Sequence, residues 1–241
     1  MEIIRPNIFS QYRHVIVGMS TTTPGSHYDR NMSYHVGDDP VRVRMNREKF
    51  YAALGVQEDQ VAFPLQQHTD TVMVCSAPRQ FPSCDGLMTD SVNVFLAVTI
   101  ADCTPVILFD FHQQAIGALH AGWRGTSKGI AQKGLITMTE RFRTDPKHLR
   151  AFIGPSAGIC CYEVGPEVAR QFPESCIHAG DYGKWHVDVK KANMLQLLEY
   201  GVEESHIEVH PDCTIHNPKY HSYRRDKEKS GRMLAIIGMT Q

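Results

Sequence analysis

The sequence predicts an α/β fold in which the β-sheets are mixed rather than purely parallel. Short apolar runs rich in β-branched residues alternate with segments of helical periodicity along the 241 residues. Two of these runs, "PVILFD" at 105–110 and "AIGALH" at 115–120, are separated only by "FHQQ". A connection this short joins antiparallel strands, so a purely parallel sheet of the Rossmann type is not expected.

The runs predicted as strands are bounded by turn residues and have strand length. They are "HVIVGM" at 14–19, "TVMVC" at 71–75, "VNVFLAVTI" at 92–100, "PVILFD", "AIGALH", "RAFIGP" at 150–155, "HIEVH" at 206–210 and "MLAIIGM" at 233–239.

Four segments are predicted as helices because their apolar residues recur at helical spacing. They span residues 40–55, 126–143, 165–172 and 188–200. Thr126 or Ser127 can cap the second helix, and Gly201 can end the fourth. No internal repeat, low-complexity segment or linker divides the chain, so we expect one domain over residues 1–241.

Composition and charge exclude several classes of protein. With 25 basic and 26 acidic residues, no net charge draws the chain to nucleic acid or to an acidic membrane surface. The apolar stretch "SVNVFLAVTIA" is too short to span a bilayer, and no signal peptide or nucleotide-binding glycine motif is present. Seven cysteines without a secretion signal favour reduced thiols. We therefore expect a cytoplasmic protein that binds a small molecule.

Three side chains that can bind a metal stand at the ends of apolar runs. They are His68 in "FPLQQHTD", Cys103 in "ADCTPVILF" and His120 in "AIGALHAGWRG". Strand ends lie at the rim of a sheet, where α/β proteins place their sites. Two imidazoles and a thiolate supply three ligands of a tetrahedral zinc site whose fourth position is open. Taken singly, each histidine is better explained as a hydrogen-bonded turn residue, and a free cysteine is most commonly a small buried side chain.

Two arginines are candidates for binding an anion. Arg124 lies between glycines at the predicted start of a helix, where backbone N–H groups also attract anions. A pairing with an acidic neighbour explains Arg124 equally well. Arg47 in "PVRVRMNREKF" is, on spacing alone, a solvated charge on a helix.

Two further features receive structural interpretations. The charged run "HSYRRDKEKSGRM" at 221–233 is predicted to be a turn before the last strand. The side chains of the adjacent residues Cys160 and Cys161 are expected to diverge too strongly for an ordinary disulfide, so packing or a pocket wall is favoured.

A series of specific motifs occurs from about Gly18 to the C-terminus. In chain order they are "YHVGDDPVRVRMNR", "QQHTD", "CDGLMTD", "TIADCTPVILFD", "GALHAGWRGTSKGI", "IGPSAGICCYEVG" and "SYRRD" with "GRM". In this order they resemble the YfiH-type family, also called laccase-like or polyphenol-oxidase proteins and peptidoglycan editing factors. The most specific pair is "ADCTPV" followed by "HAGWRG".

The resemblance implies a four-layer α-β-β-α sandwich with mixed β-sheets and a zinc ion held by His68, Cys103 and His120. It also implies a purine nucleoside phosphorylase for adenosine, inosine, guanosine and 5′-methylthioadenosine, with adenosine deaminase activity. Cys103 and His120 then belong to the catalytic site together with Arg47, which matches the family's pocket arginine. Arg47 is the first choice for binding phosphate and Arg124 the second. Copper, which the laccase name implies, is the weaker alternative to zinc.

One stretch departs from the family pattern. The family usually has Ser-Thr-Arg before a glycine pair, and this chain has "STTTPGSHYDRNMS" with Thr22 in the place of that arginine. The substitution affects the expected substrate preference, for which Arg30 could compensate.

Three other functions remain open for this chain. A cysteine hydrolase acting on an amide, such as a peptidoglycan precursor, would use Cys103 as nucleophile with His120 or His68 as base. A copper-dependent polyphenol oxidase would consume oxygen. A binding module without catalytic activity would tolerate the loss of His68 or Cys103.

Overall fold

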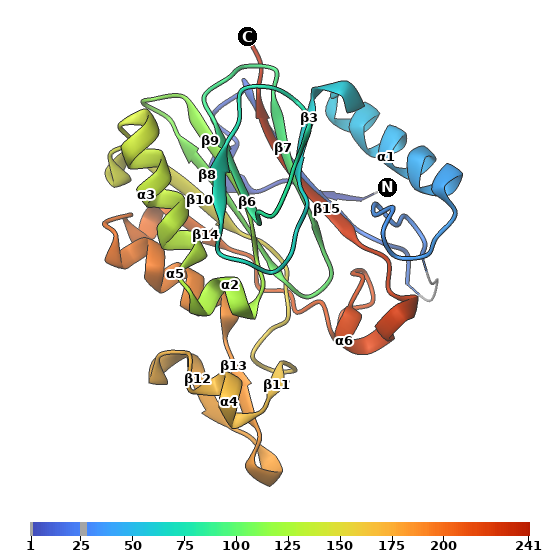
Figure 1. Ribbon diagram of the computed structural model, residues 1–241, viewed down its shortest axis with the longest axis vertical. Helices are drawn as coiled ribbons and strands as arrows, with labels where there is room; N and C mark the ends of the chain where they lie inside the picture. Colours follow the sequence, from blue (N-terminus) through green and yellow to red (C-terminus); the bar gives the residue numbers. More distant parts are fainter. Residues whose placement is uncertain (1, 25–27) are drawn as a thin grey trace.

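The computed structural model describes residues 2–24 and 28–241. Two six-stranded sheets packed face to face form the centre of the protein (Figure 1). The first sheet has the order β1-β2-β15-β7-β3-β5. Its strands are β1 (Ile3–Ile4), β2 (Val15–Ser20), β15 (Met233–Met239), β7 (Phe95–Ile100), β3 (Val61–Pro64) and β5 (Gln80–Phe81). The four neighbouring strands β1, β2, β15 and β7 pair antiparallel. β3 runs parallel to both of its neighbours, β7 and β5.

The second sheet is also mixed and has the order β14-β10-β8-β9-β6-β4. Its strands are β14 (Ile207–Val209), β10 (Leu149–Ile153), β8 (Thr104–Asp110), β9 (Ala115–Ala121), β6 (Gly86–Thr89) and β4 (Val72–Val74). β8 and β9 form the antiparallel hairpin that the short connection predicts. The two outer pairs, β14 with β10 and β4 with β6, are parallel.

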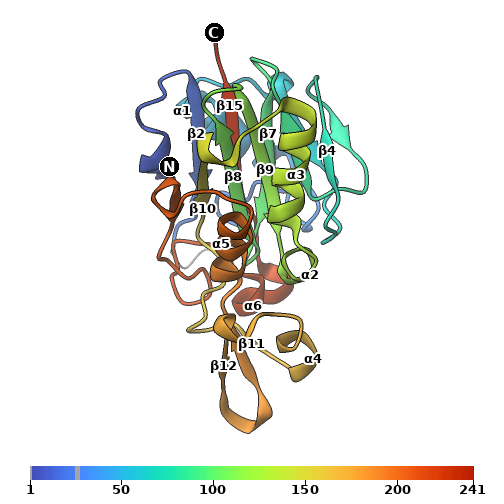
Figure 2. The same cartoon turned by 90° about the vertical axis from the view of Figure 1, so that its left-hand side faces the viewer.

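Helices cover the outer faces of both sheets. Helix α1 (Pro40–Leu54) packs on the first sheet, and helices α3 (Ile130–Phe142) and α5 (Val189–Glu199) pack on the second (Figure 2). Buried side chains such as Val98, Ile107 and Ile237 fill the space between the sheets. The four-layer α-β-β-α sandwich with mixed sheets is therefore confirmed.

A small three-stranded sheet projects from one end of the sandwich (Figure 1). It consists of β11 (Glu163–Val164), β13 (Trp185–Val187) and β12 (Ile177–Ala179), with the short helix α4 (Pro166–Ala169) beside it. Apolar side chains of the sheet and of the segments around it, including Phe172 and Cys176, form a separate cluster.

The predicted helices differ from the structure mainly at one place. The single helix predicted over residues 126–143 is replaced by two, α2 (Trp123–Ser127) and α3. They are separate because Gly129, between them, adopts a φ of +80°, which is not helical. Thr126 and Ser127 therefore lie inside α2 and cap nothing. The fourth helix agrees with its prediction, since Asp188 caps α5 and Gly201 follows it with a φ of +99°.

Two other predictions need shorter corrections. The helix expected over 165–172 is reduced to α4, and the charged run expected to be a turn contains the short helix α6 (Tyr223–Asp226). Single turns of 3-10 helix lie at Asn7–Phe9, Glu58–Gln60, Pro146–His148, Glu174–Cys176, Asp181–Gly183, Glu204–His206 and Lys227–Lys229. Among the described residues, no helix has the length and apolar character needed to cross a bilayer.

Candidate active site

His68, Cys103 and His120 meet where the two sheets come together at one end of the sandwich. One donor atom of each residue lies within 4.8 Å of the other two. His68 follows β3 of the first sheet, and His120 lies near the end of β9 in the second. Cys103 occupies the link through which the chain passes from β7 to β8, from one sheet to the other. The structure thus brings together the three residues that the sequence analysis singled out.

The buried carboxylate of Asp85 orients both histidines. It accepts a hydrogen bond from Nδ1 of His120 at 2.8 Å and from the backbone N–H of His68 at 3.0 Å. It also accepts the backbone N–H groups of Gln67 and Thr69 and the Thr69 hydroxyl. Because a carboxylate accepts at Nδ1, Nε2 of His120 is the ring atom left for Cys103 or a metal. The sequence analysis missed Asp85, although it lies in the motif "CDGLMTD".

The charges of the cluster favour a cation. Burial opposes ionisation of Cys103, but the charge of His120 and hydrogen bonds from His120 and His68 outweigh it and lower the thiol pKa to about 6. Burial likewise opposes the charge on His120, but Cys103 and Asp85 raise the pKa of His120 to about 9. Thiolate and imidazolium therefore face each other at neutral pH, and a divalent cation would replace the proton on the ring.

The donor set fits zinc. A thiolate and two imidazoles are the ligands of known catalytic zinc sites, which keep one position open. Gly122 leaves the space that the cluster needs, because a Cβ there would come within 3.0 Å of Cys103 Sγ and 3.1 Å of His68 Cδ2. Three ligands make a site for one ion and not a cluster of several copper ions.

A cavity of about 660 Å³ opens over these three residues. The rest of its wall consists of Thr99, Ala101, Asp102, Trp123, Arg124, Tyr162, Tyr223, Arg224, Lys227 and Arg232. The carboxylate of Asp102 is already engaged, because it accepts the Thr214 hydroxyl at 2.7 Å and the Arg224 backbone N–H at 2.6 Å. Four basic side chains in the wall outnumber this carboxylate and the Cys103 thiolate and give the cavity a positive potential that attracts an anion.

Arg124 lies in this wall, on α2. Its guanidinium carbon is 4.4 Å from the centre of the Trp123 ring. The helix begins at Trp123 and not near Thr126, and it has five residues, so the side chain and not the helix terminus is the feature that can bind an anion.

Arg47 lies in a second cavity of about 350 Å³ next to the first. Its Nε donates to the carbonyl of Met32 at 2.8 Å, and its guanidinium carbon is 4.6 Å from the ring centres of Tyr34 and Phe63. The side chain is buried, so its interpretation as a solvated helix charge is wrong. The two cavities share the wall residues His68, Thr99 and Arg232.

The charged run at 221–233 contributes more to the cavity than the sequence analysis expected. Arg224, Lys227 and Arg232 all line it. The signal was available in "SYRRD" and "GRM", but a run of charges is more often a solvated turn.

Among its described residues, the stretch that departs from the family pattern reaches the second cavity only at its last residue, Ser33. Thr22 is buried and donates its hydroxyl to the carbonyl of Asp29 at 2.7 Å. Within the described part of the chain, neither cavity wall includes Thr22 or Arg30. Residues 25–27 of this stretch lie outside the described residues.

Known proteins resemble this chain over most of its length. A curated relative from Deinococcus radiodurans, named purine nucleoside phosphorylase, is 38% identical over 212 residues, which cover 84% of this chain and 79% of the relative. A relative of the same name from Bacteroides thetaiotaomicron is 32% identical over 231 residues, covering 88% and 86%.

Solved structures agree with the fold. YlmD from Geobacillus stearothermophilus has a TM-score of 0.91 at 31% identity, with 100% of this chain and 97% of that chain covered. The hypothetical protein YfiH from Bacillus licheniformis has a TM-score of 0.88 at 30% identity, with 96% and 94% covered. A family model described as multi-copper polyphenol oxidoreductase laccase matches residues 14–240. The chain therefore belongs to this family, the YfiH-type family that its motifs resemble.

Proposed function

We propose that the chain is a zinc-dependent purine nucleoside phosphorylase that also deaminates adenosine. The observation that carries the proposal is the donor set of His68, Cys103 and His120 beneath a cavity with basic and aromatic walls. Relatives named purine nucleoside phosphorylase support the same reaction class. The proposed substrates are adenosine, inosine, guanosine and 5′-methylthioadenosine.

Aromatic side chains of the cavity suit a purine base. Trp123, Tyr162 and Tyr223 line the wall, and flat rings of this kind stack on nucleobases. A purine nucleoside carries no charge, so the basic side chains must serve the second substrate. The walls of the cavity thus offer stacking for one substrate and charge for the other.

Phosphate is the anion that the basic side chains would hold. Arg124 faces the main cavity, and Arg47 approaches from the neighbouring one across their shared wall. Arg232 lines both cavities and can support either arginine. Guanidinium groups bind phosphate through paired hydrogen bonds, which fix its orientation towards the ribose carbon.

Zinc held by His68, Cys103 and His120 would, when bound, supply Lewis acidity at its open position for polarising the substrate or solvent. Cys103 then acts as a ligand and not as a nucleophile. Asp85 keeps Nδ1 of His120 protonated, so the ring presents Nε2 in a fixed direction. The free thiols of the chain support a proposed cytoplasmic location, where cysteines stay reduced.

The test uses full-length protein loaded with zinc. Inosine with phosphate should yield hypoxanthine, and adenosine should yield inosine. Cys103→Ser should lose the zinc of this site and both reactions.

Arg47→Gln and Arg124→Gln should keep the zinc but raise the KM for phosphate about tenfold or more, because each removes a charge-assisted contact. Arg141→Gln, on an exposed position of α3, is the matched control and should change neither value. Zinc-loaded protein that performs neither reaction would refute the proposal.

A cysteine hydrolase is the second candidate because one observation favours it. Cys103, His120 and Asp85 are linked as a nucleophile, a base and the acid that orients the base, in that order. Metal content separates the two functions, since a thiolate bound to zinc does not react with iodoacetamide. Metal-free protein that hydrolyses an amide, with Cys103 alkylated rapidly, would favour the hydrolase. Oxygen consumption that depends on added copper would favour a polyphenol oxidase.

A further inference from the structure

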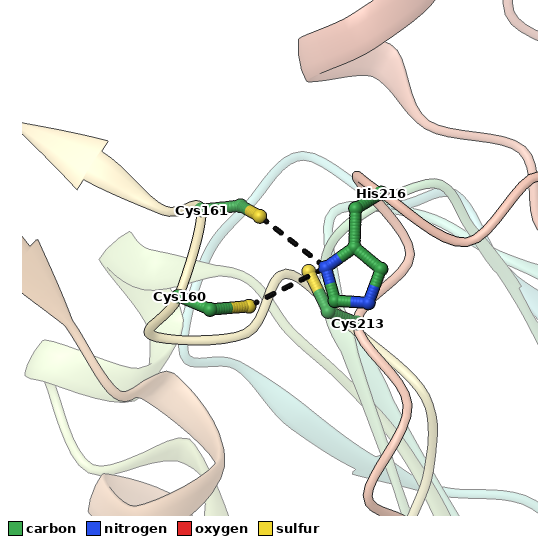
Figure 3. Close-up of side chains that lie close together, drawn as sticks. All are labelled: Cys160, Cys161, Cys213 and His216. Atoms are coloured by element: carbon green, nitrogen blue, oxygen red, sulfur yellow. Dashed lines mark hydrogen bonds between the residues drawn. The ribbon is translucent and has the colours of Figure 1, made fainter.

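A second group of sulfur and nitrogen donors lies outside the candidate active site (Figure 3). Donor atoms of Cys160, Cys161, Cys213 and His216 all lie within 4.8 Å of one another. The first two residues precede β11, and the other two follow β14, so the group joins segments that are distant in the sequence. These residues do not line the cavity described above. We call them the Cys3His cluster.

The backbone turn before β11 makes the adjacent cysteines converge. The N–H groups of Cys161 and Tyr162 both donate to the carbonyl of Gly158, at 3.0 and 2.9 Å. Both thiols point towards Nδ1 of His216 (Figure 3). As expected, Cys160 and Cys161 form no disulfide with each other, but the expectation that they pack or line a pocket wall is corrected. Cys213 completes the group from the opposite segment.

The separations in the Cys3His cluster match those around a tetrahedral zinc ion. Zn–S bonds of about 2.3 Å and Zn–N bonds of about 2.0 Å at tetrahedral angles place sulfur and nitrogen about 3.5 Å apart. Nδ1 of His216 lies 3.6 Å from Cys160 Sγ and 3.4 Å from Cys161 Sγ. These two sulfur–nitrogen separations are therefore those that a single zinc ion requires, and all four donor atoms lie within 4.8 Å of one another.

Two features of the surroundings favour a thiolate at Cys213. The backbone N–H of Gly158 donates to Cys213 Sγ at 3.2 Å, as N–H groups do to the sulfur ligands of metal sites. The buried ammonium of Lys190 donates to the carbonyls of His210 and Asp212 and lies close enough to attract negative charge on Cys213 and Cys160. Three thiolates, one neutral imidazole and a divalent ion sum to one negative charge, which Lys190 would balance.

We propose that Cys160, Cys161, Cys213 and His216 bind one zinc ion in a closed structural site. Three sulfurs and one nitrogen fill the four positions that zinc prefers, so no position remains for a substrate. Magnesium and calcium require oxygen ligands, and the donors of this cluster are sulfur and nitrogen.

This ion would fasten the wall of the active-site cavity. Thr214, next to Cys213, donates its hydroxyl to Asp102 beside Cys103. Tyr162 follows Cys161 directly and lines the cavity. The ion would therefore hold the base of the small sheet and the link that carries Cys103 in fixed positions. The inference does not depend on which reaction the cavity performs.

The test counts zinc atoms in the full-length chain, purified without a metal-binding tag and gel-filtered after zinc loading. Wild type should hold two zinc ions per chain, and Cys103→Ser should hold one, because its Cys3His cluster is intact. The double variant Cys161→Ser/Cys213→Ser should also hold one. In cobalt-loaded protein, the thiolate-to-cobalt absorption should fall to about a quarter in the double variant, since three of the four sulfur ligands are lost.

Two further variants keep the result interpretable. His216→Cys preserves four ligands and should retain both ions, whereas Cys176→Ser removes a buried cysteine outside both groups and should do the same. Zinc absent from Cys103→Ser would overturn the proposal even if the double variant fails to fold. Two ions retained by the double variant would overturn it as well.

Discussion

Asp85 is the residue through which the histidine ligands depend on the rest of the molecule. Its side chain is fully buried and accepts five hydrogen bonds, four from residues 67–69 and one from His120. Sequence reasoning found His68, Cys103 and His120 because strand ends and donor chemistry are visible along the chain. It missed Asp85 because a carboxylate in a short motif shows its role only when the atoms that it binds are placed around it.

Replacing Asp85 with asparagine should weaken metal binding and also destabilise the fold. An amide keeps the shape but loses the charge that holds Nδ1–H of His120, so zinc affinity at this site should fall by about 10- to 100-fold. The free energy of unfolding should fall by about 3 kcal/mol, because charge-assisted buried hydrogen bonds are lost. Competition with a chelator measures the first effect and urea unfolding the second. Asp90→Asn, at an exposed position, should leave both values unchanged, and an equal result for the two variants would contradict the role assigned to Asp85.

At the scale of elements, long segments with a regular sequence pattern were predicted correctly, whereas helix breaks and very short strands were not. The hairpin of β8 and β9 and helices α1 and α5 follow the sequence pattern closely, because each has a long apolar face or a clear cap. The break at Gly129 between α2 and α3 was missed, since a glycine in a helical pattern usually costs stability without ending the helix. Strands as short as β5 and β11 carry too few residues to show alternation.

Helix α2 touches the loop that carries His68, and Gly125 permits this contact. A Cβ at Gly125 would come within 2.6 Å of the backbone carbonyl of Thr69. Gly125→Ala should gain about 1 kcal/mol of helix propensity but lose about 2 to 3 kcal/mol from overpacking, so the variant should be less stable by about 1 to 2 kcal/mol. Because the carbonyl must move, His68 should also shift and zinc affinity should fall.

Thermal unfolding and zinc titration of Gly125→Ala measure these effects. Ser127→Ala is the matched control, since it lies on the same helix at a half-buried position and loses only the hydroxyl contacts with Arg124 and Gln171, so it should stay within about 1 kcal/mol of wild type and keep its zinc affinity. A Gly125→Ala protein as stable as wild type, with unchanged zinc affinity, would show that α2 does not set the position of the loop.

At the scale of the whole molecule, the site exists because the chain changes sheets beside Cys103. β7 belongs to the first sheet and β8 to the second, so the link between them crosses the sandwich at its end. Residues from both sheets and from the last third of the chain can therefore reach one cavity. No local pattern shows that the run at 221–233 reaches this cavity, which is why Arg224, Lys227 and Arg232 were assigned to a turn.

Two segments that are distant in the sequence also meet near this cavity, and His221 joins them. Its Nε2 lies 2.9 Å from the carbonyl of Asp29, and its ring is packed against Gly231. Burial lowers the pKa of His221 from its ordinary 6.5 to about 4; the charges of Arg232 and Arg225 act in the same direction, and the Asp29 carbonyl and Asp226 act against it. Between about pH 4 and pH 6.5, this ring is therefore neutral in the folded protein but protonated in the unfolded chain.

This difference predicts how stability depends on pH. Above pH 6.5 the ring is neutral in both states, so His221 adds no pH dependence there. As the pH falls from about 6.5 to about 4, the unfolded chain binds the proton first, and the contribution of His221 to the free energy of unfolding should fall by roughly 3 kcal/mol. His221→Gln can keep a donor to Asp29 without titrating, so its stability should decline less over this interval. Urea unfolding of both proteins at pH 7, 5.5 and 4.5 measures the difference, which should change by about 1.4 kcal/mol per pH unit. If the free energies of unfolding of the two proteins changed equally with pH, the pKa of His221 would not be lowered in the folded protein, and the segments around Asp29 and Gly231 would not enclose the ring.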